Sequence, residues 1–462
     1  MTKAEQRRAL DARLVGEAML SDEGHTVLRA LCDTYGSRFA GSRDERRAGD
    51  FLLERMGAAG LQGVHAESFR FLAWERRRRP TLQVVSPVKL TLECIALPYS
   101  PATRKGGLEL EVLNLGAGLP EDFARARREV KGKAVLVTSE SPSYYHRWVH
   151  RAEKYARAVA LGAKAFLFMN HYDGLLEPTG ALRFNRRAEV PGLGVSKETG
   201  LRLLRAGDGQ PLRVRIVAHD RSFSTRSRNI IGELPGTAHP DEVVLVGGHY
   251  DGHDISQGAQ DNGSGVATVL EAARLLAPHA GELKRTVRFI CFGCEEIGLL
   301  GSHAYVDRHA AAMAKVRLVV NVDCIGSSRG KGYNFQGWEE AKKPLAAMAG
   351  EMRESIPFQS RPHPYSDHFP FMVAGVPVCT LGSVGGGPGR GYGHTAADTF
   401  DKVSRADLRE GASVLVRSLL RFANDRAWAL RHKKVAEVRR MLDRYELIDV
   451  MKAEGTLPPA LK

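Results

Sequence analysis

The stretch DEVVLVGGHYDG, residues 241–252, decides the fold class. It opens with a nearly continuous apolar run rich in valine, which is typical of a strand buried on both faces of a sheet. Two similar runs follow, TVRFICFG at 286–293 and VRLVVNV at 316–322, and the helical pattern GVATVLEAARLLAPH lies between the first two at 265–279. Strands that alternate with helices predict an α/β sheet with helices on both faces.

Charged and imidazole side chains stand where these predicted strands end. His249 follows the first strand, Glu295 and Glu296 follow the second, and Asp323 follows the third. In open α/β sheets, functional sites form in the crevice beyond the carboxyl ends of the strands. We therefore expect these four side chains to meet at one edge of the sheet.

Two glycine-rich loops add further residues of the same chemistry. Asp261 lies in GAQDNGSG at 258–265, just before the predicted helix, and His394 lies in GRGYGHTAADT at 389–399, after a later strand. Glycines let the backbone approach a ligand closely. Imidazole and carboxylate are the ligands that zinc takes in catalytic sites.

The charges of this set balance around two zinc ions. Two Zn²⁺ ions carry four positive charges, Asp261, Glu296 and Asp323 carry three negative ones, and His249 and His394 are neutral. A bridging hydroxide would supply the fourth negative charge. Each residue alone has an ordinary structural explanation as a hydrogen-bonded histidine, a turn residue or a solvated carboxylate. Their joint occurrence at strand ends favours a metal site.

The segments GGHYDG, GAQDNGSG, EEIGLLGS, NVD, SDHFPF, GVP and GHTAADTFDKV together resemble the co-catalytic zinc aminopeptidase family. That family includes bacterial leucyl aminopeptidases, carboxypeptidase Q and glutamate carboxypeptidase. The motifs span roughly residues 225–425, and SRFAGSRDERRAGDFLLERMGAAGL at 37–61 is similar to the N-terminal segment of the family. The block at about 100–220 looks like a protease-associated domain, a module that several members carry as an insertion.

This resemblance implies a zinc-exopeptidase (phosphorylase/hydrolase-like) fold, a three-layer α/β sandwich with a mixed central sheet and an inserted β-rich protease-associated domain. We expect residues 1–80 to form the N-terminal part of the peptidase domain and 81–224 the insertion. Residues 225–425 would form the catalytic zinc peptidase domain and 426–462 a C-terminal helical extension.

The resemblance also implies roles for the ligands. His249 and Asp323 would hold one zinc ion, Glu296 and His394 would hold the other, and Asp261 would bridge both. Cobalt or manganese could substitute for zinc.

Further residues match positions around the metals in the family. Glu295 would be the general base, and Asp251 would accept the far N–H of His249. Tyr392 is a candidate donor to the tetrahedral oxygen, and Asp367 matches a motif near the substrate pocket. The peptide bond after Asp261 is often cis in this family.

The implied function is that of a di-zinc exopeptidase that removes N-terminal residues from peptides by metal-activated hydroxide. A carboxypeptidase Q-like dipeptidase or carboxypeptidase on the same fold is an alternative, because D-x-x-Q-G-A at 254–259 is reminiscent of carboxypeptidase Q. A receptor-like binding protein on a decayed peptidase fold is a further alternative. It is disfavoured because every ligand position holds a competent residue.

Composition sets the remaining expectations. The 462 residues carry 67 Lys and Arg against 53 Asp and Glu, a formal charge of +14 that is partly concentrated at 74–79 and 431–434. Because these runs lack interleaved aromatic residues, a solvated face is favoured over a nucleic-acid-binding role. No apolar stretch reaches the roughly eighteen residues of a membrane span. The first twenty residues do not read as a secretory signal, so we expect a cytoplasmic protein.

Two smaller patterns complete the sequence. Six cysteines are sparse, and Cys291 and Cys294 form a C-x-x-C pair that we interpret as buried reduced thiols. Near the end of the chain, an apolar stripe at helical spacing could pack on the chain's own sheet or on a second subunit. We favour the former. The stripe consists of Val435, Val438, Leu442 and Tyr445.

Overall fold

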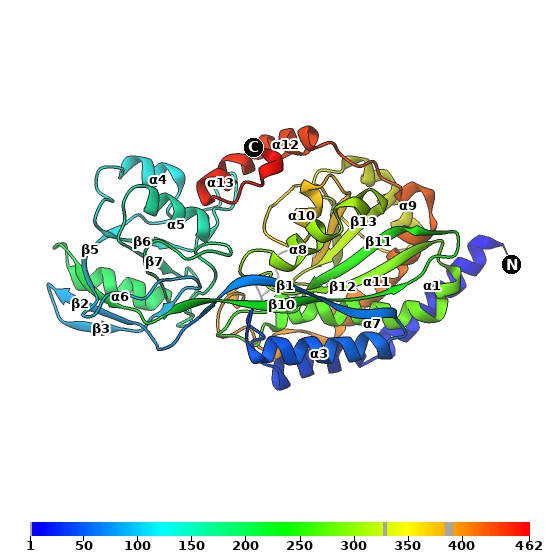
Figure 1. Cartoon of the computed structure of the whole chain (residues 1–462), viewed down its shortest axis with the longest axis horizontal. Coiled ribbons are helices and arrows are strands. Elements are labelled where there is room, and N and C mark those ends of the chain that lie inside the picture. Colours follow the sequence, from blue (N-terminus) through cyan, green and yellow to red (C-terminus); the bar gives the residue numbers. More distant parts are fainter. Residues whose placement is uncertain (1, 327–329, 384–390) are drawn as a thin grey trace.

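The computed structural model describes residues 2–326, 330–383 and 391–462, which form two domains, each around its own sheet (Figure 1). The larger sheet has eight strands in the order β1-β10-β12-β11-β13-β16-β14-β15. Strands β12, β11, β13 and β16 are parallel neighbours. The pairs β1–β10, β10–β12 and β14–β16 are antiparallel, and β15 is parallel to β14, so the expected mixed sheet is confirmed. The strands are β1 (Gln62–Glu75), β10 (Arg221–Leu234), β11 (His239–His249), β12 (Arg285–Phe292), β13 (Val316–Val322), β14 (Lys331–Asn334), β15 (Phe358–Gln359) and β16 (Val378–Ser383).

Helices cover both faces of the larger sheet (Figure 1), as the strand–helix alternation predicted. On one face lie α1 (Lys3–Leu20), α2 (Glu23–Arg29), α3 (Arg43–Ala58), α7 (Ser264–Leu276) and α11 (Arg405–Asn424). On the other lie α8 (Leu300–Arg308) and α10 (His368–Val373), while α9 (Lys342–Met352) contacts α11. The valines and leucines of the parallel strands are buried between these layers, which explains their continuous apolar runs.

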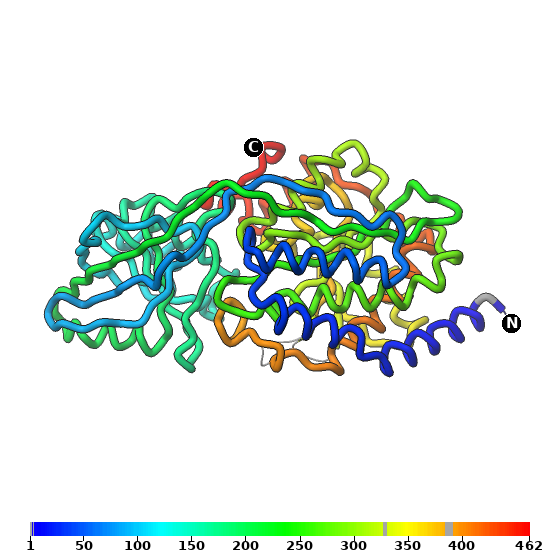
Figure 2. The backbone as a smooth tube through the Cα atoms, turned by 60° about the horizontal axis from the view of Figure 1, so that its bottom comes forward, coloured from blue at the N-terminus to red at the C-terminus, as the bar shows by residue number. Residues whose placement is uncertain are grey.

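The smaller domain has its own core and sheet, in the order β3-β2-β9-β5-β6-β7-β8-β4. Its strands are β2 (Thr81–Ser86), β3 (Leu90–Leu92), β4 (Ile95–Ala96), β5 (Leu108–Asn114), β6 (Ala134–Thr138), β7 (Ala165–Met169), β8 (Gly192–Val195) and β9 (Arg213–Val217). Its helices are α4 (Pro120–Arg125), α5 (Arg151–Ala160) and α6 (Lys197–Gly207). The paired strands β1 and β10 lead into and out of this domain and run side by side in Figure 2.

The C-terminal helices α12 (Val435–Arg444) and α13 (Leu447–Glu454) join the two domains. Helix α12 contacts α10 of the larger domain, and α13 contacts α5 of the smaller one (Figure 1). Val438 and Leu442 are fully buried in the larger core, which confirms that the predicted stripe packs on its own chain, although Val435 is 42% exposed. A homo-oligomer through this segment stays a prediction.

Local contacts and the cysteines complete the description of the fold. The Ser42 hydroxyl accepts the main-chain N–H of Glu45 at the start of α3, and the Glu45 carboxylate accepts the main-chain N–H of Gly41. Arg77, Arg78 and Arg79 of the basic run are exposed, as the predicted solvated face requires, whereas Arg76 is largely shielded and pairs with Asp254 at 2.5 Å. All six cysteines are free thiols. Among the described residues, no helix is both long and apolar enough to cross a membrane.

Candidate metal centre

The parallel strands deliver four of the predicted residues to one edge of the larger sheet. β11 ends at His249, Asp323 follows β13 directly, and Glu295 and Glu296 stand just beyond β12. Since β11, β12 and β13 are parallel, their carboxyl ends coincide. His249 and Glu296 are buried, and Asp323 is partly exposed.

Asp261 lies at the centre of the cluster, in the turn η2 (Ala259–Gly263) before α7. Its Oδ1 is 3.2 Å from Nε2 of His249, and its Oδ2 is 3.2 Å from Nε2 of His394. The two oxygens of one carboxylate therefore face two different imidazoles. Asp398 holds the turn in place, because its carboxylate accepts the main-chain N–H groups of Gln260 and Asp261.

The small residues of GAQDNGSG let this turn pack against the end of β13. A Cβ on Gly265 would lie 2.2 Å from the carbonyl oxygen of Val322, so only glycine fits there. Asn262 donates to the same carbonyl and accepts the main-chain N–H of Cys324. The Asp261–Asn262 peptide bond is cis, as the family resemblance implied.

Each imidazole that faces Asp261 has a second carboxylate beside it. Nε2 of His249 is 3.6 Å from Oδ1 of Asp323, and Nε2 of His394 is 3.8 Å from Oε2 of Glu296. The five predicted ligands therefore lie in two groups on either side of Asp261, and their binding of metal stays a prediction.

The donor atoms fit a metal better than a hydrogen-bond network. Nε2 of His249, Oδ1 of Asp323 and Oε1 of Glu296 are buried and make no hydrogen bond. A buried polar atom without a partner is costly, and a divalent cation among these atoms would remove that cost. His249, Asp261 and Glu296 each offer one donor atom within 4.8 Å of the others, and zinc binds such imidazole and carboxylate donors.

Asp251 differs from its predicted role. Nδ1 of His249 lies 3.1 Å from the main-chain oxygen of Asp251 and 3.6 Å from its carboxylate, so the imidazole is oriented by the main chain. The Asp251 carboxylate instead accepts the main-chain N–H groups of Glu295 and Glu296, at 3.0 and 3.3 Å. It thereby fixes the loop that carries the predicted base and one predicted ligand.

Glu295 is partly exposed and close to one of the two ligand sets. Its carboxylate offers an oxygen within 4.8 Å of donor atoms of His249 and Asp323. Burial raises the pKa of Glu295 well above its usual value, opposed by His249 and reinforced by Asp323 and Asp367. Glu295 is thus a carboxylate that stands beside the predicted ligands and could accept a proton from water at that place.

The other two predicted residues, Asp367 and Tyr392, are not among the grouped donor atoms. Asp367 is fully buried at the start of α10, where burial raises the pKa of its carboxyl to about 7. The ring of Tyr392 lies 5.2 Å from Nζ of Lys402, and Tyr392 does not line the pocket described below. Its role as a donor to the tetrahedral oxygen therefore stays a prediction that this geometry does not support.

Sequence reasoning missed three residues at the centre. The ring of His253 packs on that of His394, with centroids 4.2 Å apart, and burial lowers the pKa of His253 well below its usual value. The hydroxyl of Ser366 donates to Oδ2 of Asp323 at 2.6 Å. Cys324 offers a sulfur near Asp323, and burial raises the pKa of this thiol well above its usual value. His253 could have been noticed in HYDGHD, four positions after His249.

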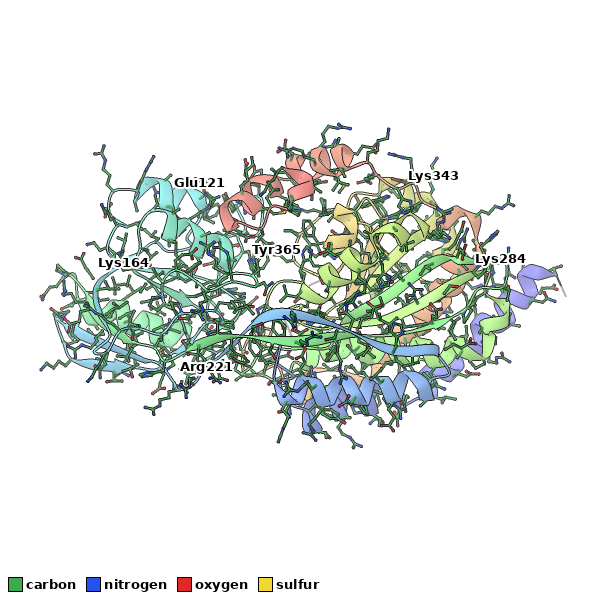
Figure 3. The ribbon with its side chains drawn as sticks, viewed as in Figure 1. Glu121, Lys164, Arg221, Lys284, Lys343 and Tyr365 are labelled. Atoms are coloured by element: carbon green, nitrogen blue, oxygen red, sulfur yellow. The ribbon has the colours of Figure 1, made fainter. Side chains whose placement is uncertain are left out.

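A pocket of about 800 Å³ opens onto the centre and is lined from three parts of the chain. The metal cluster, by which we mean His249, Asp261, Glu296, Asp323 and His394, contributes four of these five residues to the lining. The junction wall is formed where the domains meet, and Figure 3 labels Tyr365 at this place. It consists of Trp148 and His150 from the smaller domain, Tyr365 from the larger one and Glu454 from α13.

Contacts within the junction wall tie its parts together. The hydroxyl of Tyr365 donates to Oε1 of Glu454 at 3.1 Å, and Nδ1 of His150 is 3.4 Å from that oxygen. The Trp148 ring meets the rings of Tyr365 and His150 edge-on, with centroids 5.5 and 5.1 Å apart. Arg183 of the smaller domain donates to the main-chain oxygen of Glu454. The smaller domain and the C-terminal helix thus enclose one side of the pocket.

A mixed α/β sheet with imidazoles and carboxylates converging beyond its parallel strands defines a metallohydrolase. Residues 229–418 match the family model of peptidase family M28, and residues 100–203 match that of the PA domain. These matches agree with what the sequence motifs implied: a metallopeptidase whose larger domain matches peptidase family M28 and whose insertion matches the PA domain.

Curated relatives cover most of the chain. Aminopeptidase YwaD of Bacillus subtilis is 29% identical over 408 residues, which cover 85% of this chain and 82% of that protein. Carboxypeptidase Q of Mus musculus is 28% identical over 320 residues, which cover 68% of this chain and 67% of that protein.

Solved structures share the fold. A peptidase M28 precursor from Shewanella amazonensis matches with a TM-score of 0.80 at 23% identity, over 94% of this chain and 99% of that chain. BSAP, a zinc aminopeptidase from Bacillus subtilis, matches with a TM-score of 0.68 at 25% identity, over 88% of this chain and 97% of that chain.

Proposed function

We propose that this metallopeptidase is an aminopeptidase that holds two zinc ions and removes N-terminal residues from peptides. The observation that carries the proposal is the position of Asp261, whose two oxygens each lie 3.2 Å from a different histidine. A carboxylate placed between two imidazoles is what a bridged pair of divalent ions requires.

Three residues would hold each ion. His249, Asp323 and one oxygen of Asp261 would hold the first, and Glu296, His394 and the other oxygen of Asp261 would hold the second. When bound, the zinc ions polarise the scissile carbonyl and lower the pKa of a water molecule toward about 7. Cobalt or manganese would serve as substitutes, because they accept the same imidazole and carboxylate donors.

Glu295 moves the proton. Its carboxylate accepts a proton from the attacking water and then gives it to the leaving amine, the usual division of work for a general base that later acts as an acid. Asp251 positions this carboxylate through the main-chain N–H of Glu295. Ser366 orients Asp323 through its hydroxyl, and Asn321 in turn donates to Ser366. A base held in this way needs no rearrangement at the moment of reaction.

The lining of the pocket favours a free amino terminus over a free carboxyl terminus. Asp307 lines the pocket, where its carboxylate would attract a substrate ammonium group. A carboxypeptidase needs a cation for the terminal carboxylate. Arg151 lines the pocket, but its guanidinium donates to the carbonyl oxygens of Ala181 and Thr179. The longer match to aminopeptidase YwaD supports the same conclusion.

The test combines a substrate panel with a variant of the base. Free peptides, N-acylated peptides and C-amidated peptides are assayed with the zinc-loaded enzyme. We expect cleavage of free and C-amidated peptides and none of N-acylated ones. Glu295→Gln should lower kcat by about 10²- to 10⁴-fold with the zinc content unchanged. Glu54→Gln, on an exposed position of α3, is the matched control and should leave both unchanged.

Two results would overturn the proposal. Efficient cleavage of N-acylated dipeptides with no cleavage of C-amidated peptides would move the chain to the carboxypeptidase Q-like alternative. A near-normal kcat for Glu295→Gln would remove Glu295 from the role of base, whatever the substrate.

A further inference from the structure

His253 is a buried histidine at the metal centre that no motif of the family accounts for. It lies in the loop between β11 and η2 and is 1% exposed. Its Nε2 is 2.8 Å from Oε2 of Glu296, and its ring packs edge-on against that of His394. His253 therefore lies against Glu296 and His394, the two residues that would bind the second ion and not the first.

Hydrogen bonding does not explain why Nε2 of His253 lies so close to Oε2 of Glu296. Neither ring nitrogen of His253 makes a hydrogen bond, although Nε2 is close to a carboxylate oxygen. His249 shows the same pattern, since its Nε2 faces Asp261 and Asp323 and makes no hydrogen bond either. Buried nitrogen atoms that approach carboxylates without hydrogen-bond geometry are expected where a cation belongs between them.

With His253 included, four donor atoms would surround the second ion. His253, Glu296 and His394 each offer a donor atom within 4.8 Å of the others. The fourth donor is Oδ2 of Asp261, which is 3.2 Å from Nε2 of His394. In a tetrahedral zinc site with bonds of about 2.0 Å, neighbouring ligand atoms lie about 3.3 Å apart. The separation between His394 and Asp261 agrees with that value.

We propose that His253 is a fourth protein ligand of the ion held by Glu296, His394 and Asp261. This inference rests on the proposed two-zinc function and adds that the two ions differ in their number of protein ligands. Four protein ligands complete the shell of zinc, as in structural sites, whereas three ligands leave a position open. The ion at Glu296 is then the tightly held one. The ion at His249 and Asp323 keeps its open position for water or substrate and exchanges more readily.

The experiment measures metal binding directly. Apo-enzyme is titrated with Zn²⁺ against a competing chelator for the wild type, His253→Ala and the control His303→Ala, which removes a histidine that lines the pocket outside the metal cluster. We expect two zinc ions of unequal affinity in the wild type and in the control. In His253→Ala the tighter ion should bind at least about tenfold more weakly, since even residues that only orient a ligand change metal affinity about 10- to 100-fold.

A second variant separates direct ligation from orientation of Glu296. His253→Cys loaded with Co²⁺ should show a thiolate-to-cobalt charge-transfer absorption in the near ultraviolet that is stronger than any in the Co²⁺-loaded wild type. Because both proteins carry Cys324, a contribution from that thiol would be the same in the two spectra. Weaker binding in His253→Ala without that absorption in His253→Cys would overturn ligation by residue 253. Unchanged binding in His253→Ala would also overturn it. A wild type that binds no zinc would instead overturn the proposed function.

Discussion

The metal cluster and the junction wall form two sides of one pocket, yet the chain builds them differently. Every residue of the metal cluster belongs to the larger domain and stands beyond a parallel strand or in a loop tied to one. The junction wall combines residues from the smaller domain, from the segment before α10 and from the end of α13. The chemistry thus depends on one rigid sheet, and the shape of the pocket depends on how separate segments pack together.

This difference separates the two functions of the pocket. Ligands at the edge of a sheet are held within the narrow tolerance that catalysis needs. A wall made by appended segments can change without disturbing that edge, so we expect it to determine which peptides fit. Variants of the metal cluster should abolish zinc binding or turnover. Variants of the junction wall should change substrate affinity and local stability.

Asp261→Asn should give the largest effect. The substitution removes the charge of the one carboxylate that faces both histidines, so we expect loss of both zinc ions and activity at background. Metal analysis after dialysis measures this directly, and far-ultraviolet circular dichroism checks that the fold is kept. Asp241→Asn, on an exposed ion pair with Lys315, is the matched control. A variant that retained two ions at wild-type affinity would show that Asp261 does not bridge.

Trp148→Ala should act on binding alone. The Trp148 side chain is 58% exposed and stands on the junction wall against Tyr365. Losing an aromatic contact of about 1 kcal/mol should raise KM by about fivefold for peptides that reach the wall, with kcat unchanged. Tyr144→Ala removes an aromatic residue nearby in sequence that is 81% exposed and outside the pocket lining. A fall in kcat without a change in KM would contradict the division of roles between the metal cluster and the junction wall.

The metal cluster was predictable from the sequence because its signals are local. Apolar runs identified the strands, and His249, Glu296 and Asp323 follow those runs within a few residues. His253 was missed because a single histidine in a loop is usually hydrogen-bonded or exposed, and no periodic pattern marks it. The pairing of Asp251 with main-chain N–H groups was also beyond the sequence, since it depends on how two strand ends meet.

The junction wall was not predictable for a different reason. Tyr365 and Glu454 are 89 positions apart, and Trp148 belongs to the smaller domain, so no sequence spacing relates the three residues. The Trp148–Tyr365 contact arises where the two domains meet, and the Tyr365–Glu454 contact arises where α13 packs beside α5. The C-terminal stripe predicted helices that pack on the chain itself, and Val438 and Leu442 confirm that. The stripe could not predict that Glu454, at the end of α13, would place its carboxyl group in the lining of the pocket.

The smallest predicted effect concerns the pH dependence of α13. Burial raises the pKa of Glu454 to about 8, opposed by the hydrogen bond from Tyr365 and reinforced by Glu153. Nδ1 of His150 accepts the main-chain N–H of Ala152, so it presents a lone pair rather than a proton to Glu454. The groups that face the carboxyl are thus Tyr365, His150, Thr456 and, less directly, Glu153 and Arg183.

The sign follows from the raised pKa. A carboxyl group whose pKa rises from about 4.5 in the unfolded chain to about 8 in the folded one binds its proton more tightly when folded. Its contribution to stability is present below about pH 4.5, is lost as the pH rises to about 8 and changes little above that. In Glu454→Gln this loss is absent, so its Tm relative to the wild type should rise by about a few °C between pH 5 and pH 8 and then level off. Because both proteins carry the same metal cluster, the pH dependence of zinc binding cancels in the difference. A Tm difference that is flat across this range would mean that Glu454 is ionised in the folded wall, and that α13 is held by a charge rather than by a neutral carboxyl.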